Sequence, residues 1–168
     1  ISLPEYGTAF IMNNAYGSSR DIMTLVHEFG HFNADFYSTD SVLWGSSNID
    51  VAEIQSQGLE VLFSQFTDEI YGEENAVAMN AETIYNMLYA IDEGCMYDEF
   101  QQYVYRTPDL TLDDVNAAFK RIAEEYGYYF EKDSAAYMWM DVHHNFQSPM
   151  YYVSYATSAL AALERTGV

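Results

Sequence analysis

Apolar residues recur at helical spacing near the start of the chain. Ser18 and Ser19 precede this run, and either hydroxyl can cap the first turn of a helix. We therefore predict a helix from residue 18 or 19 to about residue 36. The apolar positions on its face are Ile22, Leu25, Val26, Phe29 and Phe32.

The rest of the sequence predicts mostly helices, which are separated by glycine, proline and short polar runs. The predicted ranges are about 48–70, 74–105, 111–126, 134–142 and 149–165. Gly94 marks a candidate break within 74–105, and residues 145–148 form a polar break before the last helix. Thr111 and Asp114 resemble a capping box with aspartate in place of glutamate. Residues 7–14 are predicted to be extended. Together these elements predict one mainly α domain over residues 1–168 with a short N-terminal β segment.

The composition then narrows the class of protein. The chain has 168 residues, of which 49% are apolar, which is enough for one folded core. Six Lys and Arg against 26 Asp and Glu give a formal charge of −20. We expect no nucleic-acid partner, because phosphate binding needs a basic face. No apolar run reaches the roughly 18 residues of a membrane helix, so no membrane partner is expected either. The oligomeric state is left open.

Cys95 is the single cysteine, which excludes an intrachain disulfide and a cysteine-rich zinc site. This fits a reducing compartment, and we predict a cytoplasmic protein. The chain begins at Ile1 and not at a methionine, only 26 residues before its strongest motif. We therefore expect it to be a fragment of a longer chain.

That motif is HEFGH at residues 27–31, which has the HExxH pattern. His27 and His31 point the same way, because helix positions four apart are offset by only about 40°. Two imidazoles on one helix face can bind one Zn²⁺ ion, and Glu28 can act as the general base that activates water. The motif therefore predicts a zinc-dependent hydrolytic site with one ion.

A catalytic zinc ion needs a third protein ligand. The metzincin pattern would supply a histidine soon after the motif, and this chain has none there. Glu53 and Glu60 are the candidates on the predicted 48–70 helix, seven residues apart on one face and separated by roughly 10 Å. One can bind the metal directly and the other can orient a ligand histidine, and the residues alone leave this choice open.

In these two segments the chain resembles the thimet oligopeptidase and oligoendopeptidase F family of zinc metallopeptidases. TLVHEFGHF at 24–32 is similar to the family's metal helix, and DVAEIQSQGLE at 50–60 is similar to its second motif, with Gln55 where a proline is usual. The resemblance implies a zincin-like helical catalytic domain of the gluzincin type. It also implies that Glu53 is the third zinc ligand and that Glu60 supports a ligand from behind.

A third segment, HNFQSPMYYVSYATS at 144–158, resembles a family segment whose histidine and tyrosines hydrogen-bond the substrate carbonyl and the tetrahedral intermediate. Met150 stands where that segment has an aromatic residue. Carried over by position, the catalytic donors are His144 and Tyr155, with Tyr152 or Tyr151 as a second phenol. An imidazole N–H and a phenol O–H are both suited to stabilising an oxyanion.

The sequence thus predicts a zinc-dependent metalloendopeptidase that hydrolyses short peptides. The alternative is a catalytically inactive peptide-binding or scaffolding domain that keeps the peptidase fold. A broken HExxH motif or a lost third ligand would mark that alternative, and the sequence has neither. A third reading is that the isolated fragment binds zinc and lacks activity.

Overall fold

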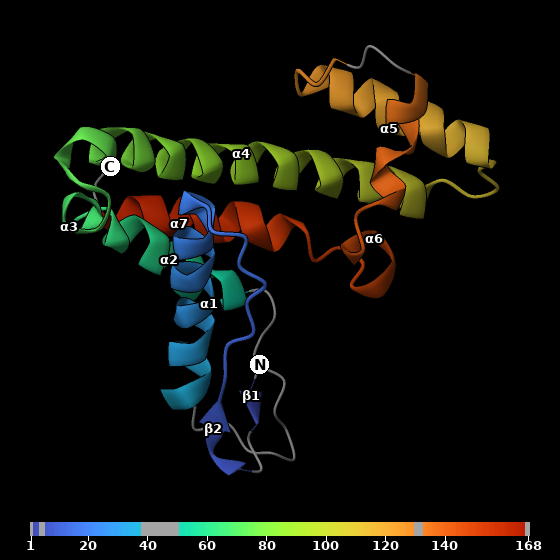
Figure 1. The fold of residues 1–168 in the computed structure, drawn as a ribbon. Coiled ribbons are helices and arrows are strands. Elements are labelled where there is room, and N and C mark those ends of the chain that lie inside the picture. The colour runs from blue at the N-terminus through green and yellow to red at the C-terminus, as the bar shows by residue number, and fades with distance from the viewer. Residues whose placement is uncertain (1, 4–5, 38–50, 130–132, 167–168) are drawn as a thin grey trace. The chain divides into compact units, whose positions relative to one another are not determined.

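The structure, a computed structural model, describes residues 2–3, 6–37, 51–129 and 133–166 (Figure 1). The fold is mainly α-helical, as predicted. The chain divides into two compact units, which we describe separately: Ile1–Leu88 with Thr157–Val168, and Tyr89–Ala156. The assignment of the whole chain to one catalytic domain stays a prediction. None of the described helices is long and apolar enough to cross a membrane.

The first unit opens with a small antiparallel ladder. Strand β1 (Ser2–Leu3) pairs with β2 (Thr8–Ala9), with Ser2 opposite Ala9 and Leu3 opposite Thr8. The extended segment predicted at 7–14 therefore forms a strand only at its beginning. Both strands contact helix α1 (Ser19–Tyr37), which has the predicted range. At the start of α1, the Asp21 Oδ2 atom accepts the backbone N–H groups of Ser18 at 2.7 Å and Tyr16 at 3.0 Å.

The helix predicted at 48–70 is two helices, α2 (Ala52–Phe63) and α3 (Thr67–Tyr71), and its first three residues lie outside the described residues. The prediction of one continuous helix is thus wrong. At the break, side chains donate hydrogen bonds to the backbone carbonyl of Ser64. Its oxygen accepts from Thr67 Oγ1 at 3.0 Å and from Asn80 Nδ2 at 3.1 Å. A helix can end here without an unsatisfied carbonyl.

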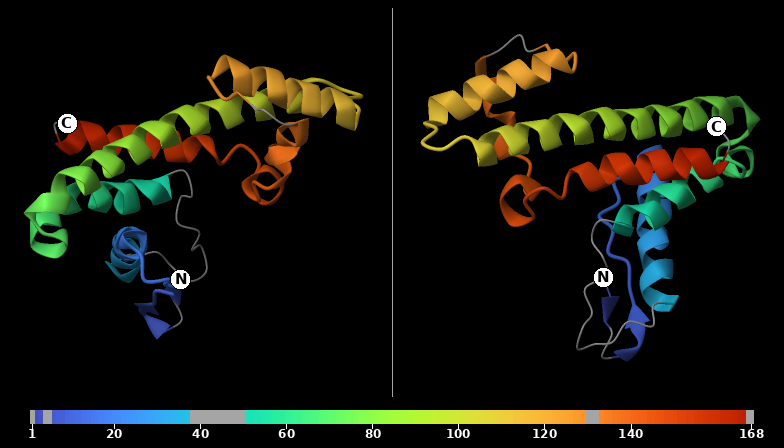
Figure 2. Two further views of the ribbon diagram at one scale, coloured as in Figure 1. Left: turned by 45° about the horizontal axis from the view of Figure 1, so that its top comes forward. Right: turned by 180° about the vertical axis from the view of Figure 1, so that it is seen from behind.

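Helix α4 (Glu73–Arg106) runs without interruption through Gly94, so the candidate break does not occur (Figures 1 and 2). The reason for a glycine here is packing. A Cβ atom on Gly94 would lie 2.8 Å from the Cβ of Ala156, well inside ordinary contact. The glycine therefore permits close approach and does not end the helix.

The second unit contains α5 (Leu112–Glu125), whose predicted capping box is confirmed. The Thr111 hydroxyl accepts the Asp114 N–H at 3.2 Å, and the Asp114 carboxylate accepts the Thr111 N–H at 2.9 Å. The apolar face of α5 packs with the second half of α4 into the core of this unit. Its buried members are Met96, Tyr97, Phe100, Phe119, Ile122 and Ala123.

The last elements differ from the prediction in three ways. The 134–142 helix is a 3₁₀ helix, η3 (Asp133–Met140), and the expected polar break contains a short helix, α6 (His144–Gln147). Helix α7 (Val153–Thr166) begins four residues later than expected. Met150 has a positive φ of 65°, and its N–H donates to Gln101 Oε1 at 2.6 Å. The left-handed backbone conformation of Met150 prevents the helix from starting at Pro149.

Candidate metal centre

The two motif histidines lie one turn apart on the same face of α1, as their spacing predicts. Their rings meet edge to face, with centroids 4.9 Å apart and planes at 81°. The Nε2 atoms of His27 and His31 are 3.2 Å apart. Each side chain is about a quarter exposed. Glu28 is half-buried on the same helix, near enough for its charge to act on His27.

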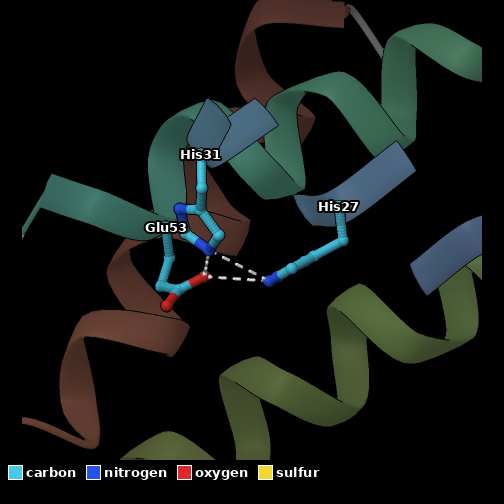
Figure 3. A group of neighbouring side chains, drawn as sticks. All are labelled: His27, His31 and Glu53. Carbon is cyan, nitrogen blue, oxygen red and sulfur yellow. Dashed lines mark hydrogen bonds and ion pairs between the residues drawn. The ribbon is translucent and has the colours of Figure 1, made fainter. Parts of the chain in front are cut away.

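Helix α2 supplies a carboxylate to these two nitrogens (Figure 3). Glu53 lies in the first turn of α2 and is buried, with 5% of its surface exposed. Its Oε2 atom lies 3.4 Å from His27 Nε2 and 3.3 Å from His31 Nε2. Three donor atoms from two helices thus form a small triangle. Within the described part of the chain, His27, His31 and Glu53 thus form a group whose ligand atoms are close enough together to hold a metal ion.

The size of this triangle matches a tetrahedral zinc site. Zinc binds His nitrogen and carboxylate oxygen at 2.0–2.2 Å, so two ligand atoms of a tetrahedron are about 3.3–3.6 Å apart. The three distances observed here are 3.2, 3.3 and 3.4 Å. Two histidines and one carboxylate are also a common donor set of catalytic zinc sites, which leave the fourth position to water. The residues therefore fit one zinc ion.

The negative charge of Glu53 is suited to binding a cation. Burial alone would raise its pKa, but hydrogen bonds from His31 and Ser56 and the charges of the two histidines lower the pKa to about 2. Ser56 Oγ donates to Glu53 Oε2 at 2.8 Å, the same oxygen that faces the imidazoles. The carboxylate is thus held in its ionised form and in one orientation.

Glu60 lies on the other side of His27. Its Oε1 atom is 2.6 Å from His27 Nδ1. Burial favours the neutral form of His27, but the hydrogen bond and charge of Glu60, with the charge of Glu53, raise the pKa of His27 above its ordinary value. With Nδ1–H donated to Glu60, Nε2 is the ring nitrogen with a free lone pair, on the side of the candidate metal site. A cavity of about 360 Å³ adjoins His27 and Glu60.

The predicted donors of the third sequence segment gather in the second unit. The ring of His144 has its centroid 5.3 Å from Tyr151, 5.7 Å from Tyr152 and 5.7 Å from Tyr155. His144, Tyr152 and Tyr155 line a cavity of about 370 Å³ together with Tyr89, Glu93 and Asp141. The segment therefore brings the predicted imidazole and phenols to one hollow.

The two predicted phenols of this cavity, Tyr152 and Tyr155, differ in their partners. Tyr155 Oη lies 3.5 Å from His144 Nε2, at the outer limit of a hydrogen bond. Tyr152 Oη donates to Glu93 Oε2 at 3.0 Å. Burial, followed by the charge of Glu93, raises the pKa of Tyr152 above its ordinary value, so this phenol stays protonated. Tyr151 is buried.

A comparison with known protein families decides the membership of the chain. The model of peptidase family M3 matches residues 4–165. The chain belongs to peptidase family M3. This is the thimet oligopeptidase and oligoendopeptidase family that the sequence motifs resemble, and its members are zinc metallopeptidases. Searches of curated proteins and of solved structures found no significant match.

Two residues of this M3 chain that adjoin the candidate site were not singled out from the sequence. Ser56 holds the Glu53 carboxylate, and Gly30 is the buried residue of α1 at its contact with α2. A signal for Gly30 exists in the sequence, because glycine inside a helix destabilises it by about 1 kcal/mol relative to alanine and such a residue usually has a packing reason. Ser56 has no such signal, since serine is common on exposed helix faces.

Proposed function

We propose that this chain carries the metal-bearing core of a zinc metalloendopeptidase that hydrolyses short peptides. The observation that carries the proposal is the His27, His31 and Glu53 triangle, whose sides are close to the ligand spacing of a tetrahedral zinc ion. Membership in family M3 supports peptide bonds as the substrate class. A cytoplasmic location stays a prediction.

The residues divide the work of peptide hydrolysis among them. His27, His31 and Glu53 would hold the ion, which supplies Lewis acidity and a water molecule of lowered pKa. Glu28 is the general base: it takes a proton from the attacking water and passes it to the leaving amine. Glu60 keeps His27 in the tautomer whose Nε2 faces the metal.

His144 and Tyr155 are the proposed donors to the oxyanion of the scissile carbonyl. Their support is that both residues line one cavity and that Tyr155 Oη lies 3.5 Å from His144 Nε2. Tyr152 is the weaker candidate for this role, because its hydroxyl proton is directed to Glu93. A donor to the oxyanion acts only if its proton is aimed at the place where the charge develops.

The decisive experiment exchanges Glu28 for glutamine in the full-length protein. Glu28→Gln should keep one zinc ion per chain, measured by elemental analysis, and should lose peptidase activity on a quenched fluorescent peptide, because an amide cannot take up the proton. Glu69→Gln, which changes an exposed carboxylate on α3, is the matched control and should leave both quantities unchanged.

The outcomes separate the alternatives. Wild-type turnover in Glu28→Gln would overturn the proposed mechanism. A wild-type protein that binds zinc and the peptide but does not cleave the peptide would favour the inactive peptide-binding domain. A wild-type protein that binds no metal would overturn the metal site itself.

A further inference from the structure

Gly30 lies where α1 packs against α2, and the structure has no room there for a side chain. The residue is buried. A Cβ atom built on Gly30 would lie 2.5 Å from the Cα of Ser56 and 2.7 Å from the carbonyl oxygen of Gln55. Both neighbours are backbone atoms, so no change of rotamer removes the overlap. Any side chain at this position therefore requires the two helices to move apart.

The residue opposite Gly30 is the one that holds the metal-facing carboxylate. Ser56 is fully buried, and its hydroxyl donates to Glu53 Oε2 at 2.8 Å. The same Oε2 atom lies 3.3 Å from His31 Nε2. The chain of contacts thus runs from the α1 backbone at Gly30, through Ser56, to the oxygen offered to the metal.

We propose that Gly30 and Ser56 are positioning residues of the metal centre. Gly30 sets the separation of α1 and α2, and Ser56 sets the position of Glu53 Oε2 over the two imidazoles. This inference rests on the proposed metal site, and it assigns to these two residues the geometry that the site requires.

The magnitudes support a functional consequence of this packing. Relief of the overlap would increase the Cβ–Cα separation from 2.5 Å to at least 3.4 Å, where ordinary contact begins. Functional constellations must be held within about 0.5 Å of their productive geometry. A helix displacement of the size that a methyl group demands therefore exceeds what the ligand triangle can absorb.

Gly58 provides an internal comparison. It lies within α2, two residues after Ser56, and a Cβ atom on it would meet nothing within 4 Å. Alanine at Gly58 is expected to leave the helix contact intact and to stabilise α2 slightly, because alanine favours helix over glycine. The same substitution at two glycines thus separates the effect of helix propensity from the effect of helix separation.

The test compares wild type, Gly30→Ala, Ser56→Ala and Gly58→Ala in the full-length protein. Zinc affinity is measured by competition with a chromophoric chelator. We expect Gly30→Ala and Ser56→Ala to weaken zinc binding by about 10–100-fold, the usual effect of residues that orient ligands, and Gly58→Ala to leave it unchanged. The visible spectrum of the cobalt-substituted protein should change in Gly30→Ala, since it reports ligand geometry and not stability.

Thermal unfolding of each metal-free variant establishes that it is folded. A folded Gly30→Ala variant with wild-type zinc affinity and a wild-type cobalt spectrum would overturn the inference. If Gly30→Ala does not fold, Ser56→Ala becomes the deciding variant, because it removes one oxygen atom and adds no bulk. Unchanged zinc affinity in Ser56→Ala would then overturn the inference, and weakened zinc affinity would support it. A wild-type protein that fails to bind zinc would instead overturn the proposed function.

Discussion

Glutamine at Glu53 and at Glu60 distinguishes a metal ligand from the residue that orients one. Glutamine has nearly the same shape as glutamate, keeps an oxygen acceptor and lacks the charge. At Glu60 the remaining amide oxygen can still accept from His27 Nδ1, where the carboxylate now lies at 2.6 Å. The tautomer of His27 is then preserved, and only the charge behind it is lost.

The expected sizes of the two effects follow from these contacts. Residues that orient a ligand typically change metal affinity by about 10–100-fold, which corresponds to about 1.4–2.7 kcal/mol. We expect Glu60→Gln near the lower end, because its hydrogen bond survives. Glu53→Gln should exceed the upper end, because the buried anion that faces both Nε2 atoms becomes neutral.

The assay is chelator competition on the full-length protein, with zinc content by elemental analysis and Glu69→Gln as the control for an exposed carboxylate. The order of the two effects is the informative result. If Glu60→Gln lost zinc and Glu53→Gln retained it, the ligand would be Glu60 and the assignment of the triangle would be refuted. Equal and small losses would show that neither carboxylate binds the ion.

Two further predictions concern the second unit. Tyr155→Phe should lower kcat by about 10²–10³-fold with little change in KM, because one oxyanion donor is lost. Tyr152→Phe should cost less, since that hydroxyl donates to Glu93 at 3.0 Å, and the reverse order in steady-state kinetics would exchange the two roles. Thr111→Ala should lower the free energy of unfolding by about 1 kcal/mol in thermal denaturation at neutral pH. Hydrogen bonds from Thr111 lower the pKa of Asp114 below its ordinary 3.8, so the part of this advantage that depends on the Asp114 carboxylate is present above that pH and declines as the pH falls further. A difference that stays constant into acid would argue against the carboxylate's part in the cap.

The sequence predicts best what depends on neighbouring residues. The spacing of His27 and His31 needs only the geometry of one helix, and the Thr111–Asp114 capping box needs only one turn. Both are present as predicted. The family resemblance rests on the same kind of short motif, and the match to peptidase family M3 confirms it.

The errors arise where a distant residue decides the backbone. The break between α2 and α3 depends on Asn80, whose amide donates to Ser64 O from helix α4. The late start of α7 depends on Gln101, which accepts the N–H of Met150 from 49 residues away. Hydrophobic periodicity carries no information on such contacts, because it reports one element at a time.

The choice between Glu53 and Glu60 shows most clearly what the helix crossing adds. Both residues lie on one face of α2, so their spacing alone cannot rank them. The close approach of Gly30 to Ser56 fixes the register, because Glu53 lies three residues before Ser56 and Glu60 four residues after it. The crossing therefore sends one carboxylate to each edge of His27: Glu53 to Nε2, beside His31, and Glu60 to Nδ1. A shift of α2 by a single residue along this contact would not let Glu53 and Glu60 exchange their positions at His27. It would instead rotate both carboxylates by about 100° away from α1. The contact of Gly30 with Ser56 therefore bears on both carboxylates at once, so a substitution at Gly30 should disturb the proposed ligand and the residue behind His27 together.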